Sequence, residues 1–247
     1  MEPGQRGTDQ ARPYVLLSCA ISVDGYTDDA SDRRLVLSCA ADLDRVDALR
    51  ATCDAILVGA GTVRADDPRL LLRSQARRQG RIAAGSSAPE RESATRIGSA
   101  PSPAAAIFAG EGARTIVYVA SQAALSATER LGAVAEVVDA GDQAADLGRV
   151  LADLSGRGVA RLLVEGGQAV RTQFLLAGLA DELQLAIAPV LVGDSRAPRF
   201  ACDGAFAADA AQRARLAEVR QVGDMVVARY RLSGRFDRAD DHSEGLG

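Results

Sequence analysis

Short apolar runs recur along most of the chain. They lie at residues 14–21, 55–58, 115–119, 136–138 and 161–165. Because polar residues do not alternate with the apolar ones in these runs, each predicts a strand, and the runs at 14–21, 55–58 and 161–165 predict buried strands of a parallel sheet.

Between several of these runs, apolar residues recur at three- and four-residue steps, which is typical of one face of an amphipathic helix. The apolar positions of the three expected helices are Leu43, Val46, Leu49 and Cys53, then Leu147, Val150, Leu151 and Leu154, then Val170, Phe174 and Leu175. Residues 74–106 instead predict a long surface loop with one short strand at 94–98, because they are rich in Arg, Ala, Ser, Gly and Pro. Alternation of strands and helices predicts an α/β fold with a largely parallel sheet.

The end of the chain has a different pattern. Residues 181–188 and 225–232 alternate apolar with polar or small side chains, which predicts an antiparallel pair of strands at the sheet edge. We therefore expect one domain over residues 13–232, with helices flanking the sheet and flexible tails at 1–12 and 233–247.

Composition excludes several kinds of function. The net charge is −4, and no basic block or long apolar run is present, so we expect neither a nucleic acid nor a membrane as partner, and a cytoplasmic location. No lysine occurs, which excludes a Schiff base and a Walker phosphate loop. The single histidine, His242, lies in the polar tail, and the four cysteines have no CxxC spacing, so we expect buried thiols and no metal site. A cofactor would then have to supply the difficult chemistry.

Two strand ends carry residues suited to binding. Gly59 and Gly61 permit a sharp turn after the run at 55–58, and Gly166 and Gly167 do the same after the run at 161–165. Backbone amides at such a turn, before a helix, suit a pyrophosphate group. A double glycine alone more often marks only a tight turn.

Glu165 favours the binding interpretation, because a carboxylate that ends an apolar strand needs a partner or a task. Asp24 is the second candidate carboxylate. Since Asp24-Gly25 is also a common turn pair, a structural role for it stays open, and we favour it.

Four motifs in order resemble a known family. They are Ser22-Val-Asp-Gly25, Thr62-Val-Arg-Ala-Asp-Asp-Pro-Arg-Leu-Leu-Leu-Arg73, Val164-Glu-Gly-Gly167, and Gly178-Leu-Ala-Asp-Glu-Leu183 followed by Ala188-Pro-Val-Leu-Val-Gly193. The chain resembles the reductase half of the bacterial bifunctional riboflavin-biosynthesis deaminase/reductase, which has a dihydrofolate-reductase-like fold. The zinc motifs of the deaminase half are absent, so a free-standing reductase is expected.

The resemblance implies an enzyme that uses NADPH to reduce the ribosylamino group of a phosphorylated pyrimidine, of the 5-amino-6-(5-phosphoribosylamino)uracil reductase type, in riboflavin biosynthesis. Cofactor contacts are implied for Ala20, Thr62, Asp66, Ser99, Gly166, Gly167 and Gln168. Substrate contacts are implied for Arg50, Leu70, Arg73 and Glu165, and the arginines suit a ribose 5-phosphate. Glu165 and Asp24 are the candidate catalytic carboxylates.

The chain also departs from the family. Ser18 stands where members commonly carry a lysine near the substrate, and Arg33 is a candidate to replace that charge. The departure leaves two other interpretations open. One is a reductase of dihydrofolate, another pterin or a specialised-metabolite pyrimidine, and the other is a non-catalytic dinucleotide-binding protein. A homodimer is expected, because family members pair and the C-terminal strands offer an apolar edge.

Overall fold

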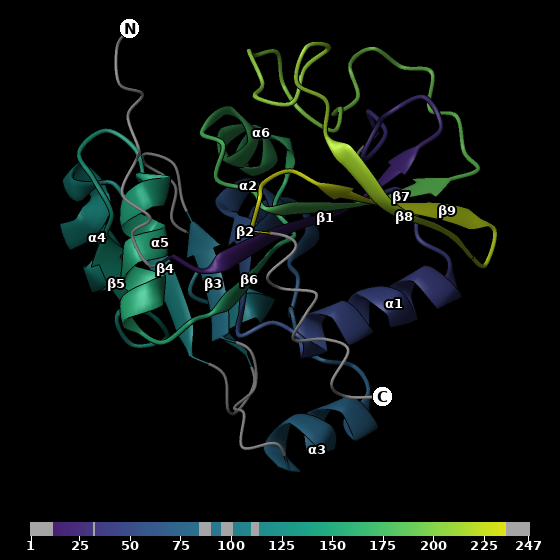
Figure 1. Ribbon diagram of the computed structural model, residues 1–247. Helices are drawn as coiled ribbons and strands as arrows, with labels where there is room; N and C mark the ends of the chain where they lie inside the picture. The colour runs from purple at the N-terminus through teal and green to yellow at the C-terminus, as the bar shows by residue number, and fades with distance from the viewer. Residues whose placement is uncertain (1–11, 32, 84–89, 95–100, 110–113, 236–247) are drawn as a thin grey trace, which may run out of the picture.

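The computed structural model describes residues 12–31, 33–83, 90–94, 101–109 and 114–235. Within them, nine strands form one sheet in the order β5-β4-β3-β2-β6-β1-β7-β9-β8 (Figure 1). The strands are β1 (Tyr14–Ser22), β2 (Ala55–Gly59), β3 (Glu90–Ala94), β4 (Thr115–Val119), β5 (Glu136–Asp139), β6 (Arg161–Val164), β7 (Glu182–Ala188), β8 (Arg215–Val222) and β9 (Met225–Arg231). The helices are α1 (Ala40–Ala51), α2 (Ala60–Asp66), α3 (Gln75–Ala83), α4 (Ser121–Leu131), α5 (Leu147–Gly156) and α6 (Gln168–Leu176), with a 3-10 turn at Ala106–Phe108.

The sheet is parallel from β5 to β7 and antiparallel beyond it. β9 pairs antiparallel with β7, and β8 pairs antiparallel with β9. This confirms the predicted mixed α/β architecture, with one correction. β9 lies one strand inside the edge, and the edge strand is β8, which we did not predict because most of its side chains are exposed and it has no continuous apolar face.

Helices cover both faces of the sheet. Alternate β1 residues point to opposite sides, so Val15 packs in one apolar cluster with Leu154 of α5 and Phe174 of α6. Leu16 packs on the other side, with Leu49 of α1. The carboxyl ends of β1, β2 and β6 are left open between these two layers.

Helix α1 differs from the expected amphipathic helix. Its fully or nearly buried positions include Asp42, Arg45 and Asp47, whereas Leu43 and Val46 are only half-buried. The apolar spacing therefore predicted the helix and the burial of Leu49 and Cys53 correctly, but not the burial of the charged positions. The charged face can be buried because each charged side chain finds a hydrogen-bonding partner inside the fold.

The segment expected to be one long loop contains helix α3. None of its side chains is buried, so the sequence lacks the apolar stripe that would have indicated a helix. Ion pairs of Arg77 with Asp44 and Asp47 instead hold α3 against α1. A short strand lies at Glu90–Ala94. Residues 95–98 of the expected strand lie outside the described residues.

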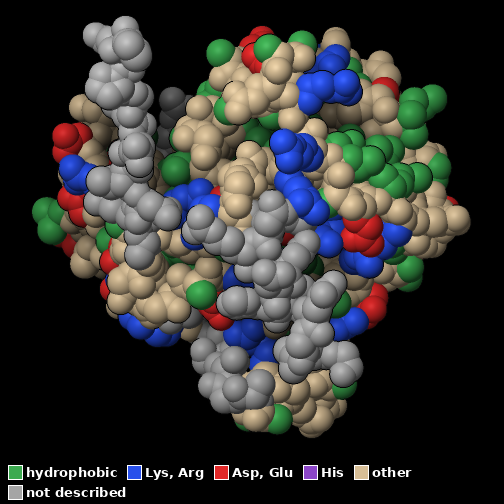
Figure 2. Space-filling model, in the orientation of Figure 1, with side chains coloured by type: hydrophobic (Ala, Val, Ile, Leu, Met, Phe, Trp, Pro, Cys, Tyr) green, Lys and Arg blue, Asp and Glu red, His purple; other side chains and the backbone are tan. Residues whose placement is uncertain are grey.

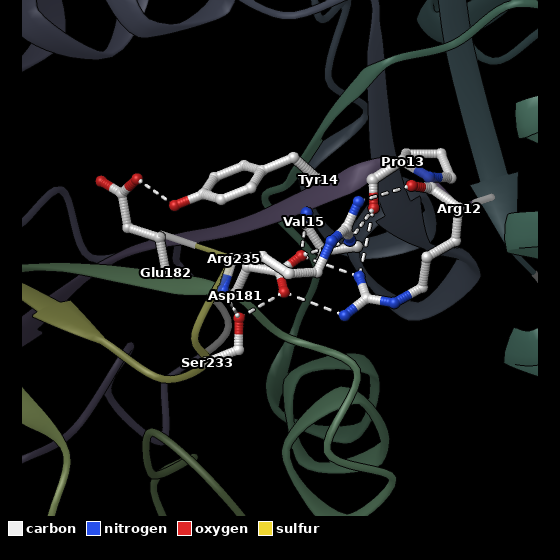
Figure 3. A network of polar contacts seen from close by, with 8 residues as sticks. All are labelled: Arg12, Pro13, Tyr14, Val15, Asp181, Glu182, Ser233 and Arg235. Atoms are coloured by element: carbon white, nitrogen blue, oxygen red, sulfur yellow. Dashed lines mark hydrogen bonds and ion pairs between the residues drawn. The ribbon is translucent and has the colours of Figure 1, made fainter. Parts of the chain in front are cut away.

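Asp181 joins the two ends of the described chain (Figure 3). Its fully buried carboxylate accepts hydrogen bonds from Arg12 at 2.7 and 2.9 Å and from the amide of Val15 at 2.9 Å. Ser233 Oγ donates at 2.6 Å and Arg235 Nη1 at 3.1 Å. The folded domain thus reaches slightly beyond the predicted limits at 13 and 232.

The cysteines are free thiols in different surroundings. Cys53 is buried, Cys19 and Cys39 are half-buried, and Cys202 is exposed, contrary to expectation. Burial raises the pKa of the Cys53 thiol to about 11, so it is inert near neutral pH. None of the helices in the described part of the chain has the length and apolarity needed to span a bilayer.

Candidate active site

A cleft of about 760 Å³ opens at the carboxyl ends of β1, β2 and β6. Open α/β sheets bind their ligands at this edge. A second cavity, of about 480 Å³, is lined by residues 68–73 on one side. The two cavities share part of their lining, which consists of Arg34, Arg50, Thr62, Asp66, Arg73 and Glu165.

Arg50 and Glu165 form an ion pair where the two cavities meet. Arg50 Nε donates to Glu165 Oε1 at 2.8 Å, and Nη2 donates to Oε2 at 2.6 Å. The two side chains are 13% and 14% exposed, so the pair is largely shielded from water. Burial opposes the charged form of Arg50, but the carboxylate of Glu165 raises the pKa of Arg50. Such a two-point pair fixes both side chains in one geometry.

The chain from 68 to 74 is held against α1. Arg50 Nη1 donates to the carbonyl oxygen of Leu71 at 3.2 Å. Asp47 accepts from the amides of Arg73 and Ser74. Burial opposes ionisation of Asp47, but these amides and Arg77 lower its pKa. Leu70, which lines the second cavity, adopts a left-handed φ of 51°.

The glycines at the strand ends are required by close packing. A Cβ on Gly166 would lie 2.8 Å from Val170 Cβ, and one on Gly59 would lie 2.8 Å from Val170 Cγ2. A Cβ on Gly167 would meet Thr62 Oγ1 at 3.0 Å. Any side chain would therefore push the β2 and β6 turns away from α6. The first two amides of α6 have no intrahelical partners, and their residues, Gln168 and Ala169, line the cleft.

Arg171 contacts the same glycine turn. It is 4% exposed, and its Nη1 donates to the carbonyl oxygen of Gly166. Its Nε donates to the carbonyl oxygen of Phe200 at 3.0 Å. A buried guanidinium thus ties the glycine turn to the segment that follows β7.

Asp66 and Arg34 face each other across the cleft mouth. The shortest distance between their charged groups is 3.6 Å, and Arg34 is 61% exposed. Burial raises the pKa of Asp66, while Arg34 opposes that shift. The contact joins the loop after β1 to the end of α2.

Most of the residues expected at the site meet in one place. The cleft lining includes Ala20, Arg50, Thr62, Asp66, Arg73, Glu165, Gly166, Gly167 and Gln168. Leu70 lines the second cavity. Ser99 lies outside the described residues.

Two expected residues lie elsewhere. Arg33 is exposed and lines neither cavity; its neighbour Arg34 lines both. Asp24 also lines neither cavity, and its carboxylate accepts from Ser22 Oγ at 2.5 Å and from the amides of Val192 and Gly193. These contacts support the structural alternative for Asp24 and leave no geometry for the catalytic one.

The sequence did not indicate six further charged residues of the cleft, which are Asp28, Arg34, Asp42, Arg45, Arg64 and Arg171. Arg34 is one of a pair of adjacent arginines, and nothing in the sequence distinguishes the two. Asp42 and Arg45 lie on α1 at positions that apolar spacing assigned to the exposed face. In the part of the chain that the structure describes, no three His, Cys, Asp or Glu side chains are grouped so as to hold a metal ion.

Comparison with known proteins gives the family. The family model described as the RibD C-terminal domain matches residues 13–228. The chain belongs to this family. It is therefore a reductase of the riboflavin pathway with a dihydrofolate-reductase-like fold, and reductases of this family use a nicotinamide cofactor.

Individual relatives agree with this assignment. The 2,5-diamino-6-ribosylamino-4(3H)-pyrimidinone 5′-phosphate reductase of Archaeoglobus fulgidus is 35% identical over 92% of this chain and 100% of its own length. The protein of that name from Methanothermobacter thermautotrophicus is 36% identical over 90% of this chain and 100% of its own. Acinetobacter baumannii RibD matches with a TM-score of 0.67 and 27% identity over 90% of this chain, which spans only 58% of that protein.

Proposed function

We propose that this member of the RibD C-terminal family is an NADPH-dependent reductase of a ribosylaminopyrimidine 5′-phosphate. The observation that carries the proposal is the Arg50–Glu165 pair, placed with Arg73 where the glycine-lined cleft meets the second cavity. One cleft thus offers both a glycine turn and arginines.

The glycine turn fits the phosphates of a dinucleotide. Gly166 and Gly167 bring backbone directly to the cleft, at the N-terminus of a nine-residue helix. Thr62 and Gln168 flank the turn with side chains that can donate hydrogen bonds. When bound, the nicotinamide supplies the hydride.

The arginines of the cleft fit an anionic sugar. Arg73 is exposed and lines both cavities, and Arg50 has a fixed orientation, so both can face a 5′-phosphate. Both oxygens of Glu165 accept from Arg50 but keep further lone pairs, which suit the hydroxyl groups of a ribose.

The chemistry follows from this placement. Opening of the ribosylamine ring gives an imine between C1′ and the exocyclic nitrogen. Reduction adds a hydride to C1′ and a proton, from water, to the nitrogen, which leaves a ribityl chain. The protein's contribution is alignment of C1′ by Glu165, Arg50 and Arg73, which makes the reaction effectively unimolecular.

The test is consumption of NADPH, followed at 340 nm. The purified protein receives the diaminopyrimidinone ribosyl phosphate, its deaminated uracil counterpart, each without phosphate, and dihydrofolate, with NADH as a parallel cofactor. We expect oxidation of NADPH with a phosphorylated pyrimidine and a much higher KM for the form without phosphate. Turnover of dihydrofolate alone would assign the protein to the pterin branch, and binding without turnover of any substrate would mean a non-catalytic protein.

A further inference from the structure

A buried carboxylate oxygen in the wall of the cleft has no hydrogen-bond donor. Asp42, on the first turn of α1, is 0% exposed and belongs to the cleft lining. Its Oδ1 accepts from Arg45 Nε at 2.7 Å, but its Oδ2 receives no hydrogen bond from any residue that the structure describes. An unsatisfied buried acceptor costs about 1–3 kcal/mol, so this oxygen is expected to have a partner when the protein works.

The direction of this oxygen is fixed by a chain of hydrogen bonds. Arg45 Nη1 donates to Gln184 Oε1 at 2.9 Å. Gln184 Nε2 in turn donates to Glu182 Oε1 at 2.8 Å, which fixes the orientation of the amide. Tyr14 holds the other oxygen of Glu182 at 3.0 Å (Figure 3). Asp42 is therefore held in place from the sheet, and its Oδ2 cannot rotate to find another donor without breaking this chain.

Asp42 and Arg50 lie at opposite ends of the same wall. They are eight residues apart on α1, which is about 12 Å along a helix axis. Leu43 and Val46 lie between them in the cleft lining and are half-buried. If Arg50 marks the phosphate end, Asp42 lies at a distance that suits the far edge of the attached pyrimidine, with an apolar wall between.

We propose that Asp42 recognises the pyrimidine ring of the substrate, and that it selects the 2-amino form. A 2-aminopyrimidin-4-one carries an amino group at C2 and an N–H at N3, so its edge offers two donors to a carboxylate. The deaminated uracil has a carbonyl oxygen at C2, which would face Oδ2 acceptor to acceptor. This assignment rests on the proposed function and adds a residue that chooses between its two substrate forms.

The selectivity expected from one such contact is large enough to measure. A site that hydrogen-bonds a substrate amino group discriminates against an analogue that leaves its buried polar atom unpaired. The 1–3 kcal/mol of an unsatisfied group corresponds to roughly 5- to 150-fold in kcat/KM. An asparagine at this position can accept or donate, so it would lose most of the preference.

The experiment compares kcat/KM for the diaminopyrimidinone ribosyl phosphate and its uracil counterpart in the wild type, in Asp42→Asn and in Asp44→Asn. Asp44 is the matched control, because it lies on the same helix with a side chain 69% exposed and outside both cavities. We expect the wild type and Asp44→Asn to prefer the diamino form by roughly 5- to 150-fold, and Asp42→Asn to approach equal use of both. Partial misfolding of a variant lowers both rates equally and cancels in the ratio.

Two results would overturn the assignment while leaving the proposed function in place. One is a wild type that uses both pyrimidines equally or prefers the uracil form. The other is an Asp42→Asn variant that keeps the wild-type ratio. A wild type that reduces neither pyrimidine would remove the proposed function itself and this assignment with it.

Discussion

Arg50 and Glu165 are 115 residues apart in the chain, and their side chains are joined by two hydrogen bonds of 2.8 and 2.6 Å. The pair connects the last turn of α1 to the end of β6, so it positions the two elements that face the substrate end of the cleft. Loss of this ion pair affects both the stability of the fold and the geometry of the site, and these two effects can be measured separately.

Glu165→Gln is expected to lower kcat/KM by roughly 100-fold or more, because it leaves a largely buried arginine without its counterion and misplaces it. Steady-state kinetics and urea unfolding of the same preparation measure the two effects. Arg196→Gln is the control: Arg196 also pairs with a carboxylate, Asp194, but is 80% exposed and should change neither quantity. Equal activity of Glu165→Gln and wild type would remove Glu165 from the substrate site.

The packing of Gly166 predicts a second result. Gly166→Ala places a Cβ 2.8 Å from Val170 Cβ, so the turn must move and cofactor binding should weaken. Titration of NADPH by fluorescence measures this. The double variant Gly166→Ala, Val170→Gly should recover much of the affinity, because it removes the Cβ and both Cγ atoms of Val170 that the added methyl group would meet. Gly80→Ala, where nothing lies within 4 Å of the added atom, should bind as the wild type does. Failure of the double variant to recover would mean that the clash is not the cause.

Asp24 predicts a loss of stability in acid. The hydroxyl of Ser22 and the amides of Val192 and Gly193 lower the pKa of Asp24 to about 2. Because the folded-state pKa lies below the unfolded value of about 3.9, folding favours the ionised form, and the stabilisation is complete above the unfolded pKa. It is lost as the pH falls from about 4 towards 2. Urea unfolding across this range should show a shallower loss in Asp24→Asn than in the wild type; parallel curves would contradict this account of the loop.

The edge of the sheet predicts a homodimer. Among the strands that the structure describes, β8 has a partner on one side only, and its Leu216 and Val219 are each 57% exposed. Hydrophobic side chains gather over the β8–β9 region on the face shown in Figure 2. We expect sedimentation as a dimer, and as a monomer after Leu216→Glu with Val219→Glu. Leu125→Glu, at a leucine 76% exposed on α4, is the control and should stay dimeric. A monomeric wild type would contradict the prediction.

Apolar runs were reliable guides to the central strands. β1, β2, β4 and β6 are buried on both faces, and a continuous apolar run has little alternative in a domain of this size. Helix α3 and strand β8 were missed for the opposite reason. Their side chains are mostly exposed, and arginine–carboxylate contacts or backbone pairing hold them, which leaves no periodic apolar signal.

The candidate site shows the same division. The glycine turn and the Arg50–Glu165 pair could be predicted as site residues because strand ends and motifs mark them. The burial of Asp42 and Arg45 could not, since it depends on Gln184, which lies 139 residues from Arg45 in the chain. From the sequence alone, a charged residue on a helix is predicted to be solvent-exposed, because its partner is known only from the fold.

The buried carboxylate of Asp181 holds the first and last described segments of the chain together. Arg235 donates to the carbonyl oxygens of Arg12 and Pro13, and all three residues lie around that carboxylate. The first and last described segments are therefore neighbours on the side of the sheet where β1 begins, whereas the cleft lies where β1 ends. A short linker between them would close the backbone into a ring without crossing the active site. This makes the protein a suitable scaffold for circular permutation, with new ends opened in an exposed turn such as the one between β8 and β9.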